Sequence, residues 1–230
     1  MRAFVLAGGL GTRLKPRFGD LPKALAPLGG RPFLTHVLEW LRGHGVRDAV
    51  LCVGYAADRL RAEWGDGSSL GMVLRYSTES EPLGTGGALR QAAPWVDGPA
   101  LVLNGDTLLS CDPWALERTR WECGAIGALA LYEVADPRGR GRVECAADGR
   151  ILRFVEKDPL NRGPALVNGG LYAFSPALWR HLPEGRSSLE RDVLPALAAA
   201  GTLRGASVAG EFFDIGTPEE WERAERRFAS

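Results

Sequence analysis

The sequence of 230 residues is poor in the side chains that most often bind metals or act as nucleophiles. It has four cysteines, and no two of them form a C-x-x-C pair. The sequence therefore predicts neither a zinc site nor a redox pair, and it favours a reducing, cytoplasmic environment. The three histidines (His36, His44 and His181) share no motif with a carboxylate or a cysteine, so we expect them to be structural or surface residues.

An excess of charge and a long apolar segment are also missing. Lys plus Arg and Asp plus Glu are 28 each, which gives a formal net charge of zero. A broad basic face for nucleic acid is not expected, because such binding depends on excess positive charge. The apolar runs, such as residues 125–132, are too short to cross a bilayer, and with one cation and five apolar residues before Gly8 the N-terminus is not expected to be a signal peptide. We therefore expect no nucleic-acid or membrane partner.

Glycine, in contrast, is abundant. It makes up 30 of the 230 residues, whereas its average share of a chain is about 7%. The glycines lie in discrete clusters, which indicates turns that approach a ligand closely rather than disorder. Apolar residues make up 45% of the chain and charged residues 24%, as in folded domains generally. The length is enough to bury a core without disulfides or structural metals.

Short apolar runs alternate with helical patterns in the first half of the chain. Strands are expected at residues 2–6, 49–53, 73–76 and 100–103, and helices at 34–41, 56–64 and 86–93. In the second half, strands are expected at 125–132, 142–145, 151–155, 166–174 and 212–215, and helices at 176–181, 189–200 and 217–228. This order predicts a single Rossmann-like α/β domain over residues 1–230. Its mostly parallel mixed sheet would carry helices on both faces and a β-rich insertion in the second half.

A glycine-rich loop, LAGGLGTRL at residues 6–14, follows the first expected strand directly. Glycines let backbone N–H groups curl around phosphate oxygens. The loop is not a dinucleotide fingerprint, because Leu14 stands where the third glycine is needed and no acid ends the second strand. It is not a mononucleotide P-loop either, because Gly11 is followed by Thr12 and Arg13.

The loop continues into a cluster of cations. Arg13, Lys15, Arg17 and Lys23 fall within eleven residues that contain one acid, Asp20. On a chain without net charge this is a local positive site. An arginine fork and a lysine point charge together suit a triphosphate. In such sheets ligands bind beyond the carboxyl ends of the strands, where residues 104–106 (Asn-Gly-Asp) are also expected to lie.

Five motifs, in order along residues 1–228, resemble the sugar-1-phosphate nucleotidyltransferase family. They are residues 8–14 with Pro16 and residues 22–25 (PKAL); residues 81–88 (EPLGTGGA); residues 104–106; residues 156–157 with 168–170; and residues 213–217 (FDIGT). The resemblance implies a nucleotide-binding half at about 1–110 and a sugar-binding half at about 111–230. It leads us to expect no left-handed β-helix of the kind that some members carry.

The reaction that the resemblance implies is attack by a sugar 1-phosphate on the α-phosphorus of a nucleoside triphosphate, with release of pyrophosphate. The attacking phosphate has a second pKa of about 6 and is already anionic at neutral pH, so no general base is required. Two anionic reactants must instead be neutralised and aligned. By resemblance, Arg13 steadies the departing pyrophosphate and Lys23 the α-phosphate.

The resemblance also implies the residues that bind the nucleotide. They are Leu6, Ala7, Gly8, Gly9, Gly11, Thr12, Arg13, Lys23, Glu81, Gly84, Thr85 and Asp106. Among these, Glu81 and the backbone of Gly84 and Thr85 are expected near the base.

Two aspartates, Asp106 and Asp214, each follow an expected strand. Together they are interpreted as catalytic residues and as the ligands of one Mg²⁺, because hard oxygen ligands and substrate phosphates suit that ion. For Asp214 a structural role stays open, since it lies beside the helix start at Thr217, where residues 217–220 (TPEE) form a capping sequence.

The sugar site is implied by resemblance as Asn104, Gly141, Glu156, Lys157, Asn168 and Gly169. Lys157 is expected to meet the phosphate of the sugar, as a catalytic residue, and Glu156 a sugar hydroxyl. A solvated charge pair is the alternative for these two. One departure from the family is Arg140, where a tyrosine is common; an extra cation that favours a more acidic sugar phosphate and a merely exposed side chain are the two alternatives there.

The choice of substrate depends on later segments. Residues 187–195 and 213–219 resemble the short guanylyltransferases for heptose 1-phosphate and mannose 1-phosphate, which favours GTP. A uridylyltransferase for an amino-sugar phosphate, such as N-acetylmuramic acid 1-phosphate, is the alternative. A second alternative is an inactive regulatory relative, although the loop arginine, the lysine and both aspartates that such relatives lose are present. The sequence is compatible with a homodimer.

Overall fold

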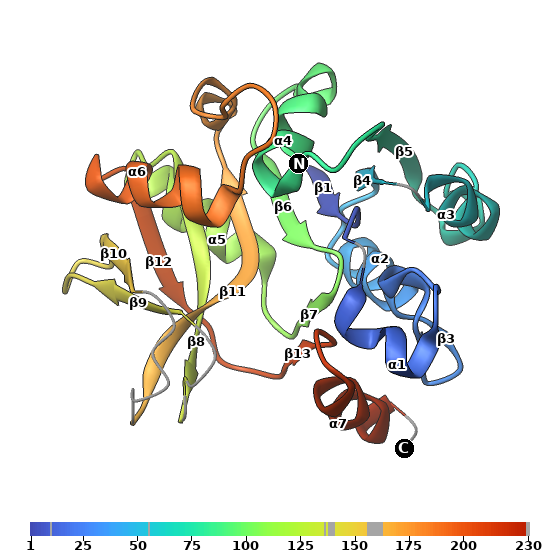
Figure 1. The fold of residues 1–230 in the computed structure, drawn as a ribbon. Coiled ribbons are helices and arrows are strands. Elements are labelled where there is room, and N and C mark those ends of the chain that lie inside the picture. The colour runs from blue at the N-terminus through green and yellow to red at the C-terminus, as the bar shows by residue number, and fades with distance from the viewer. Residues whose placement is uncertain (10, 55, 136, 138–140, 156–162, 229–230) are drawn as a thin grey trace.

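The computed structural model describes all residues except 10, 55, 136, 138–140, 156–162 and 229–230. The described residues form one large mixed sheet of nine strands with helices packed against it (Figure 1). The strand order is β10-β9-β11-β6-β1-β4-β5, with β8 beside β11 and β12 beside β8. The strands are β1 (Arg2–Leu6), β4 (Asp48–Val53), β5 (Val73–Thr78), β6 (Ala100–Asn104), β8 (Gly127–Val134), β9 (Arg142–Cys145), β10 (Ile151–Val155), β11 (Ala165–Phe174) and β12 (Leu203–Ser207).

The strands of the first half form parallel ladders. β1 lies between β4 and β6 and is parallel to both, and β5 is parallel to β4. Leu6, at the carboxyl end of β1, lies opposite Cys52 on one side and Asn104 on the other. The register therefore confirms that the glycine-rich loop and residues 104–106 meet at one edge of the sheet.

The second half adds antiparallel strands. β11 is antiparallel to β6 and β8, and β9 and β10 form a hairpin across the expected turn at Asp148 and Gly149. β12 has no counterpart among the expected strands, because its sequence LRGAS alternates poorly and contains a glycine. It returns parallel to β8. Two small ladders lie outside the sheet, β7 (Thr107–Leu109) with β13 (Phe212–Asp214) and β2 (Pro27–Leu28) with β3 (Arg31–Pro32).

Helices cover both faces of the sheet, as predicted. Alternate residues of β1 point to opposite faces: Ala3 and Val5 pack in one core and Phe4 in the other. The first core takes side chains from α2 (Phe33–Gly43), α3 (Ala57–Trp64), α5 (Pro113–Glu122) and α7 (Pro218–Phe228). The second takes them from α4 (Gly84–Gln91) and α6 (Leu194–Ala199). The short α1 (Lys15–Phe18) follows the glycine-rich loop.

Several helices differ from expectation. α5 was not predicted, and its sequence PWALERTRWE has only a weak apolar stripe. The helix expected at 189–200 is a π-helical turn, Leu189–Val193, followed by α6, and residues 176–181 contain a 3₁₀ helix, Pro176–Arg180. Further 3₁₀ turns are Thr12–Leu14, Lys23–Leu25, Ser68–Leu70 and Ala93–Trp95. Within the described part of the chain, no helix has the length and apolar character needed to span a membrane.

Candidate active site

Lys23 lies between two aspartates that are remote from it in sequence. Its Nζ is 2.6 Å from Asp106 Oδ2 and 3.9 Å from Asp214 Oδ1, and 12% of its side chain is exposed. The β7–β13 ladder brings the two aspartates together, because Asp214 lies opposite Thr107 and the N–H of Ile215 donates to the carbonyl of Asp106 at 3.1 Å. Tertiary pairing, rather than local sequence, therefore assembles this group.

Two glycines allow the cations to approach this group. A methyl group on Gly11, where φ is +59°, would lie 3.1 Å from Lys23 Cβ. A methyl group on Gly216 would lie 3.2 Å from Arg13 Nη2 and 2.8 Å from Asp214 Oδ1. The guanidinium of Arg13 therefore lies beside the Asp214 carboxylate. Of the five residues predicted to be catalytic, the structure brings four together: Arg13, Lys23, Asp106 and Asp214.

The environment of Asp214 disfavours its charged form. Burial raises the pKa of this carboxyl, and the neighbouring carboxylates of Asp106 and Glu220 raise it further, while the Lys23 ammonium opposes the shift. The N–H of Gly216 also donates to Asp214 Oδ1, at 2.7 Å. A cation between the two aspartates would relieve their repulsion.

The donor set fits Mg²⁺ in an open site. Asp106 and Asp214 supply hard oxygen ligands, and the described residues contain no group of three or more metal-binding side chains that could close a site. Mg²⁺ is commonly held by one or two carboxylates together with substrate phosphates. The two aspartates therefore suit a Mg²⁺ ion whose remaining ligands come from the substrate phosphates.

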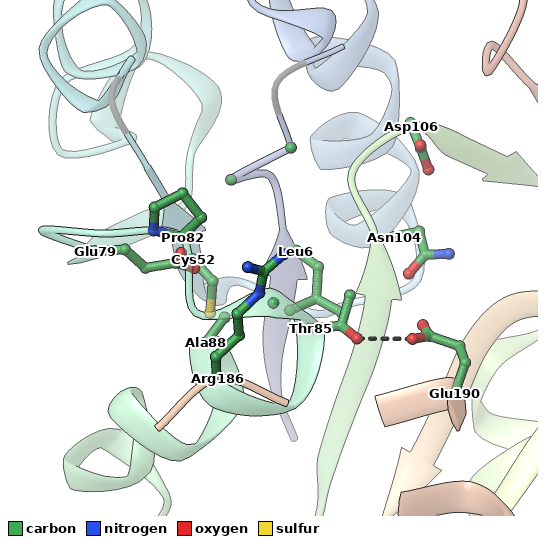
Figure 2. Close-up of a pocket in the computed structure, with 13 residues that line it drawn as sticks. Leu6, Cys52, Glu79, Pro82, Thr85, Ala88, Asn104, Asp106, Arg186 and Glu190 are labelled. Carbon is green, nitrogen blue, oxygen red and sulfur yellow. Dashed lines mark hydrogen bonds between the residues drawn. The ribbon is translucent and has the colours of Figure 1, made fainter. Parts of the chain in front are cut away.

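A cavity of about 310 Å³ adjoins this group. Figure 2 shows Asp106 and Asn104 at one end of it and Glu79 and Pro82 at the other. Its wall contains predicted site residues (Leu6, Gly8, Gly9, Gly84, Thr85, Asn104 and Asp106) and residues that were not among the predicted site residues (Cys52, Glu79, Pro82, Ala88, Arg186 and Glu190). The additional residues add apolar side chains (Cys52, Pro82 and Ala88) and charged ones (Glu79, Arg186 and Glu190) to the lining of the cavity.

Glu79, rather than Glu81, lies on the cavity wall. Glu79 directly follows β5, and its carboxylate accepts a hydrogen bond from the N–H of Leu83 at 3.0 Å. Burial raises the pKa of this carboxyl. Glu81 is exposed and is not among the residues that line the cavity. The sequence signal that could have identified Glu79 is its position shortly after an expected strand. The prediction relied instead on the motif at residues 81–88, which contains Glu81.

The glycines of that motif pack against a second segment, residues 185–190. The N–H of Gly86 donates to the carbonyl of Ser187, and the N–H of Ser187 to the carbonyl of Leu83, both at 2.9 Å. A methyl group on Gly84 would lie 2.5 Å from the carbonyl oxygen of Ser187, and one on Gly87 would lie 2.5 Å from that of Gly185. Side chains here would therefore separate the two segments.

This packing also fixes two side chains of the cavity. Thr85 Oγ1 donates to Glu190 Oε2 at 2.7 Å and accepts from the N–H of Leu189 at 2.8 Å. Figure 2 shows this bond between Thr85 and Glu190 across the lower wall. The hydroxyl of Thr85 is thus occupied by protein groups.

The predicted sugar residues gather in part around a bulge in β11. Asn168 Nδ2 donates to Tyr172 Oη at 2.8 Å, and its Oδ1 accepts from the N–H of Gly170 at 3.0 Å. A methyl group on Gly170 would lie 2.7 Å from Asn104 Nδ2, so β11 and the end of β6 touch here. Gly169 is buried, and a methyl group on it would lie 2.9 Å from the ring of Tyr132.

Of the other predicted sugar residues the structure describes one, Gly141, whose neighbour Arg142 lies opposite Val167 of β11. Gly141 precedes β9, and a methyl group on it would lie 3.1 Å from the carbonyl oxygen of Val155 in the same hairpin. Glu156, Lys157 and Arg140 lie outside the described residues.

Fold and site together define an α/β protein with charged side chains gathered at the carboxyl ends of parallel strands, and comparison with known proteins gives its family. A family model described as "Nucleotidyl transferase" matches residues 2–230. The chain therefore belongs to the nucleotidyl transferase family, which confirms the resemblance carried by the five motifs.

Three relatives illustrate the similarity. A mannose-1-phosphate guanylyltransferase from Mycobacterium tuberculosis is 39% identical over 225 residues, which are 96% of this chain and 62% of that protein. The chain thus spans about three fifths of that relative's length. A D-glycero-alpha-D-manno-heptose 1-phosphate guanylyltransferase from Campylobacter jejuni is 33% identical, over 96% of this chain and 97% of its own. The crystal structure of HddC from Yersinia pseudotuberculosis complexed with GMP-PN has a TM-score of 0.86 and 31% identity, over 99% of both chains.

Proposed function

We propose that this protein transfers a guanylyl group from GTP to heptose 1-phosphate or mannose 1-phosphate and releases pyrophosphate. The observation that carries the proposal is the placement of Arg13, Lys23, Asp106 and Asp214 as one charged group beside a cavity of about 310 Å³. Relatives that are named as guanylyltransferases for these two sugar phosphates support the choice of substrates.

In this proposal the reactants are positioned and neutralised by charge. The triphosphate follows the glycine-rich loop, with Arg13 on the departing pyrophosphate and Lys23 on the α-phosphate. Mg²⁺ held by Asp106 and Asp214 would supply further neutralisation of phosphate charge when bound. The sugar phosphate approaches from the side of Asn104, Asn168 and Gly169, with Glu156, Lys157 and Gly141 as further expected contacts.

A general base is not needed in this reaction, because the attacking phosphate is already ionised. Two of the three histidines, His36 and His44, support that view through their hydrogen bonds. His36 Nε2 hydrogen-bonds to the carbonyl of Leu28 at 2.8 Å, and His44 Nδ1 to the carbonyl of Trp40 at 2.9 Å. Both rings are thereby tied to the backbone of the fold.

The base of the nucleotide is proposed to lie at the Glu79 end of the cavity. Leu6, Cys52 and Ala88 offer an apolar surface for a flat ring there. The half-buried Glu79 carboxylate can accept from the ring N–H and the 2-amino group of guanine together. Uracil has a single ring N–H donor and cannot make both contacts. This difference favours GTP over UTP.

The proposal is tested by a pyrophosphate-release screen of GTP, UTP, CTP, ATP and dTTP against a panel of sugar 1-phosphates. The fastest turnover is expected for GTP with heptose or mannose 1-phosphate. Turnover confined to UTP with an amino-sugar phosphate would establish the uridylyltransferase alternative. Binding of a nucleotide sugar without any turnover would establish the inactive relative. Size-exclusion chromatography with light scattering would test the homodimer, and cell fractionation would test the cytoplasmic location.

A further inference from the structure

Arg186 is the one cation among the described residues that line the cavity. Neither the five motifs nor the proposed phosphate contacts include it. Its side chain is exposed, and among the residues that the structure describes it has no hydrogen-bond or ion-pair partner. The guanidinium therefore offers its full set of N–H donors to whatever enters the cavity.

The backbone that carries Arg186 is held firmly. Its neighbour Ser187 is 6% exposed and is hydrogen-bonded in both directions to the start of α4. Leu189 is bonded to the hydroxyl of Thr85, two residues further along. The side chain thus projects into the cavity from an anchored segment, and not from a free loop.

The position of Arg186 points to the base rather than to the phosphates. Figure 2 shows its guanidinium on the side of Cys52 and Pro82, with Asp106 at the opposite end of the cavity. Arg13 and Lys23 already flank Asp106 and Asp214 at the phosphate end. Glu79 also lines the cavity and no ion pair joins it to Arg186, so the Arg186 guanidinium and the Glu79 oxygen that Leu83 does not bond are available to a ligand.

We propose that Arg186 selects guanine by donating two hydrogen bonds to O6 and N7 of the ring. A planar guanidinium fork matches this pair of acceptors, and the same pairing is the commonest specific contact of arginine with guanine in nucleic acids. Adenine presents an amino group at the O6 position, which repels a donor, and uracil has no second acceptor in the place of N7. Arg186 and Glu79 then read different edges of guanine.

This inference rests on the proposed use of GTP and is tested by nucleotide binding without a sugar phosphate. The dissociation constants of GTP, 7-deaza-GTP, ITP and ATP are measured for the wild type and for Arg186→Ala. ITP lacks the 2-amino group but keeps O6 and N7, whereas 7-deaza-GTP lacks only N7. Arg191→Ala is the matched control, since Arg191 is an exposed cation in the π-helical turn Leu189–Val193, directly after residues 185–190, and does not line the cavity.

The expected result is a loss of GTP affinity on the order of 10- to 100-fold in Arg186→Ala. The preference of the wild type for GTP over 7-deaza-GTP, roughly tenfold, should disappear in the variant, and ATP should be excluded less strongly. The preference for GTP over ITP should persist, because it depends on the 2-amino group. Arg191→Ala should match the wild type, and the melting temperatures of all three proteins should agree.

Two results would overturn the assignment. An equal loss for all four nucleotides would make Arg186 a general phosphate contact, and an unchanged GTP to 7-deaza-GTP ratio would remove its contact with N7. Arg186→Gln gives the same readout if the alanine variant does not fold. A wild type that turns over UTP but not GTP in the earlier screen refutes the proposed function itself, whereas these two outcomes in a GTP-using enzyme refute only the role of Arg186.

Discussion

Lys23 and Asp106 form a partly buried ion pair of 2.6 Å, although they are 83 positions apart in the chain. The same ammonium is 3.9 Å from Asp214. One lysine thus neutralises part of the charge of two carboxylates that would otherwise repel each other. The arrangement makes the two aspartates a functional unit, and a substitution at one of them changes the surroundings of the other.

Asp106→Asn should therefore remove most of the Mg²⁺-dependent turnover, because the amide keeps the shape but lacks the charge. Adding Asp214→Asn should cost little more, since residues that act as one unit have strongly non-additive effects. Initial rates over a Mg²⁺ titration for the two single variants and the double variant measure this. Independent losses that multiply in the double variant would show that the aspartates do not share an ion.

Asp214→Asn also separates the two roles considered for this residue. Since folding raises the pKa of Asp214, its ionised form is disfavoured in the folded state, and the neutral amide should leave the melting temperature unchanged or higher at neutral pH. If Asp214 instead only supports the start of α7, the same variant should melt at a lower temperature and keep the Mg²⁺ dependence of the wild type.

Arg13→Lys should lower turnover by about 10²–10³-fold even though the charge is retained. The guanidinium beside Asp214 can contact two phosphate oxygens at once, which an ammonium cannot reproduce. Steady-state kinetics with saturating substrates measure the loss, and thermal melting checks that the fold is intact. A variant within about threefold of the wild type, well below that range, would mean that only the charge matters.

Gly87→Ala should destabilise the protein by about 1–3 kcal/mol and weaken nucleotide binding. Its methyl group would lie 2.5 Å from the carbonyl oxygen of Gly185, so the segment that carries Arg186 and Glu190 must move. Intrinsic helix propensity acts in the opposite direction, because alanine favours a helix over glycine by about 1 kcal/mol. Denaturant unfolding and nucleotide titration measure the two effects.

The matched control for this substitution is Gly43→Ala. Gly43 is also helical, and nothing lies within 4 Å of the added methyl group. This variant should be equally or more stable than the wild type. A Gly87→Ala variant that behaves like Gly43→Ala would show that the two segments do not need their close contact.

Affinity for GTP should fall on acidification. The fall should begin at a higher pH than it would if Glu79 had the pKa of an ordinary glutamate. Burial raises the pKa of Glu79, so its carboxylate takes up a proton earlier on acidification and can then no longer accept from both guanine donors. Binding titrations across the acidic range should show this fall, and Glu79→Gln should flatten it. A profile flattened by Glu81→Gln instead would place the base at the residue that the motif alone indicates.

The sequence was most informative where a function is carried by contiguous residues. The strand at Arg2–Leu6, the glycine-rich loop after it and Lys23 all lie within the first 25 residues, and their order predicts a phosphate site at a sheet edge. The same is true of the turn at Asp148 and Gly149, where a local hairpin signal suffices. Weak patterns failed: α5 has little amphipathic character, and β12 contains a central glycine.

By itself, the sequence determined the family and the α/β class, and it predicts which residues handle phosphate, because short-range spacing and backbone requirements are written in contiguous motifs. Only the tertiary structure decided which side chains line the cavity. Glu79 lines the cavity, whereas Glu81, two positions further along, does not. Arg186 reaches the cavity because residues 185–190 pack on the glycines of α4, in a distant part of the chain. Contacts between segments so far apart depend on how whole elements pack against each other, and no local spacing encodes them.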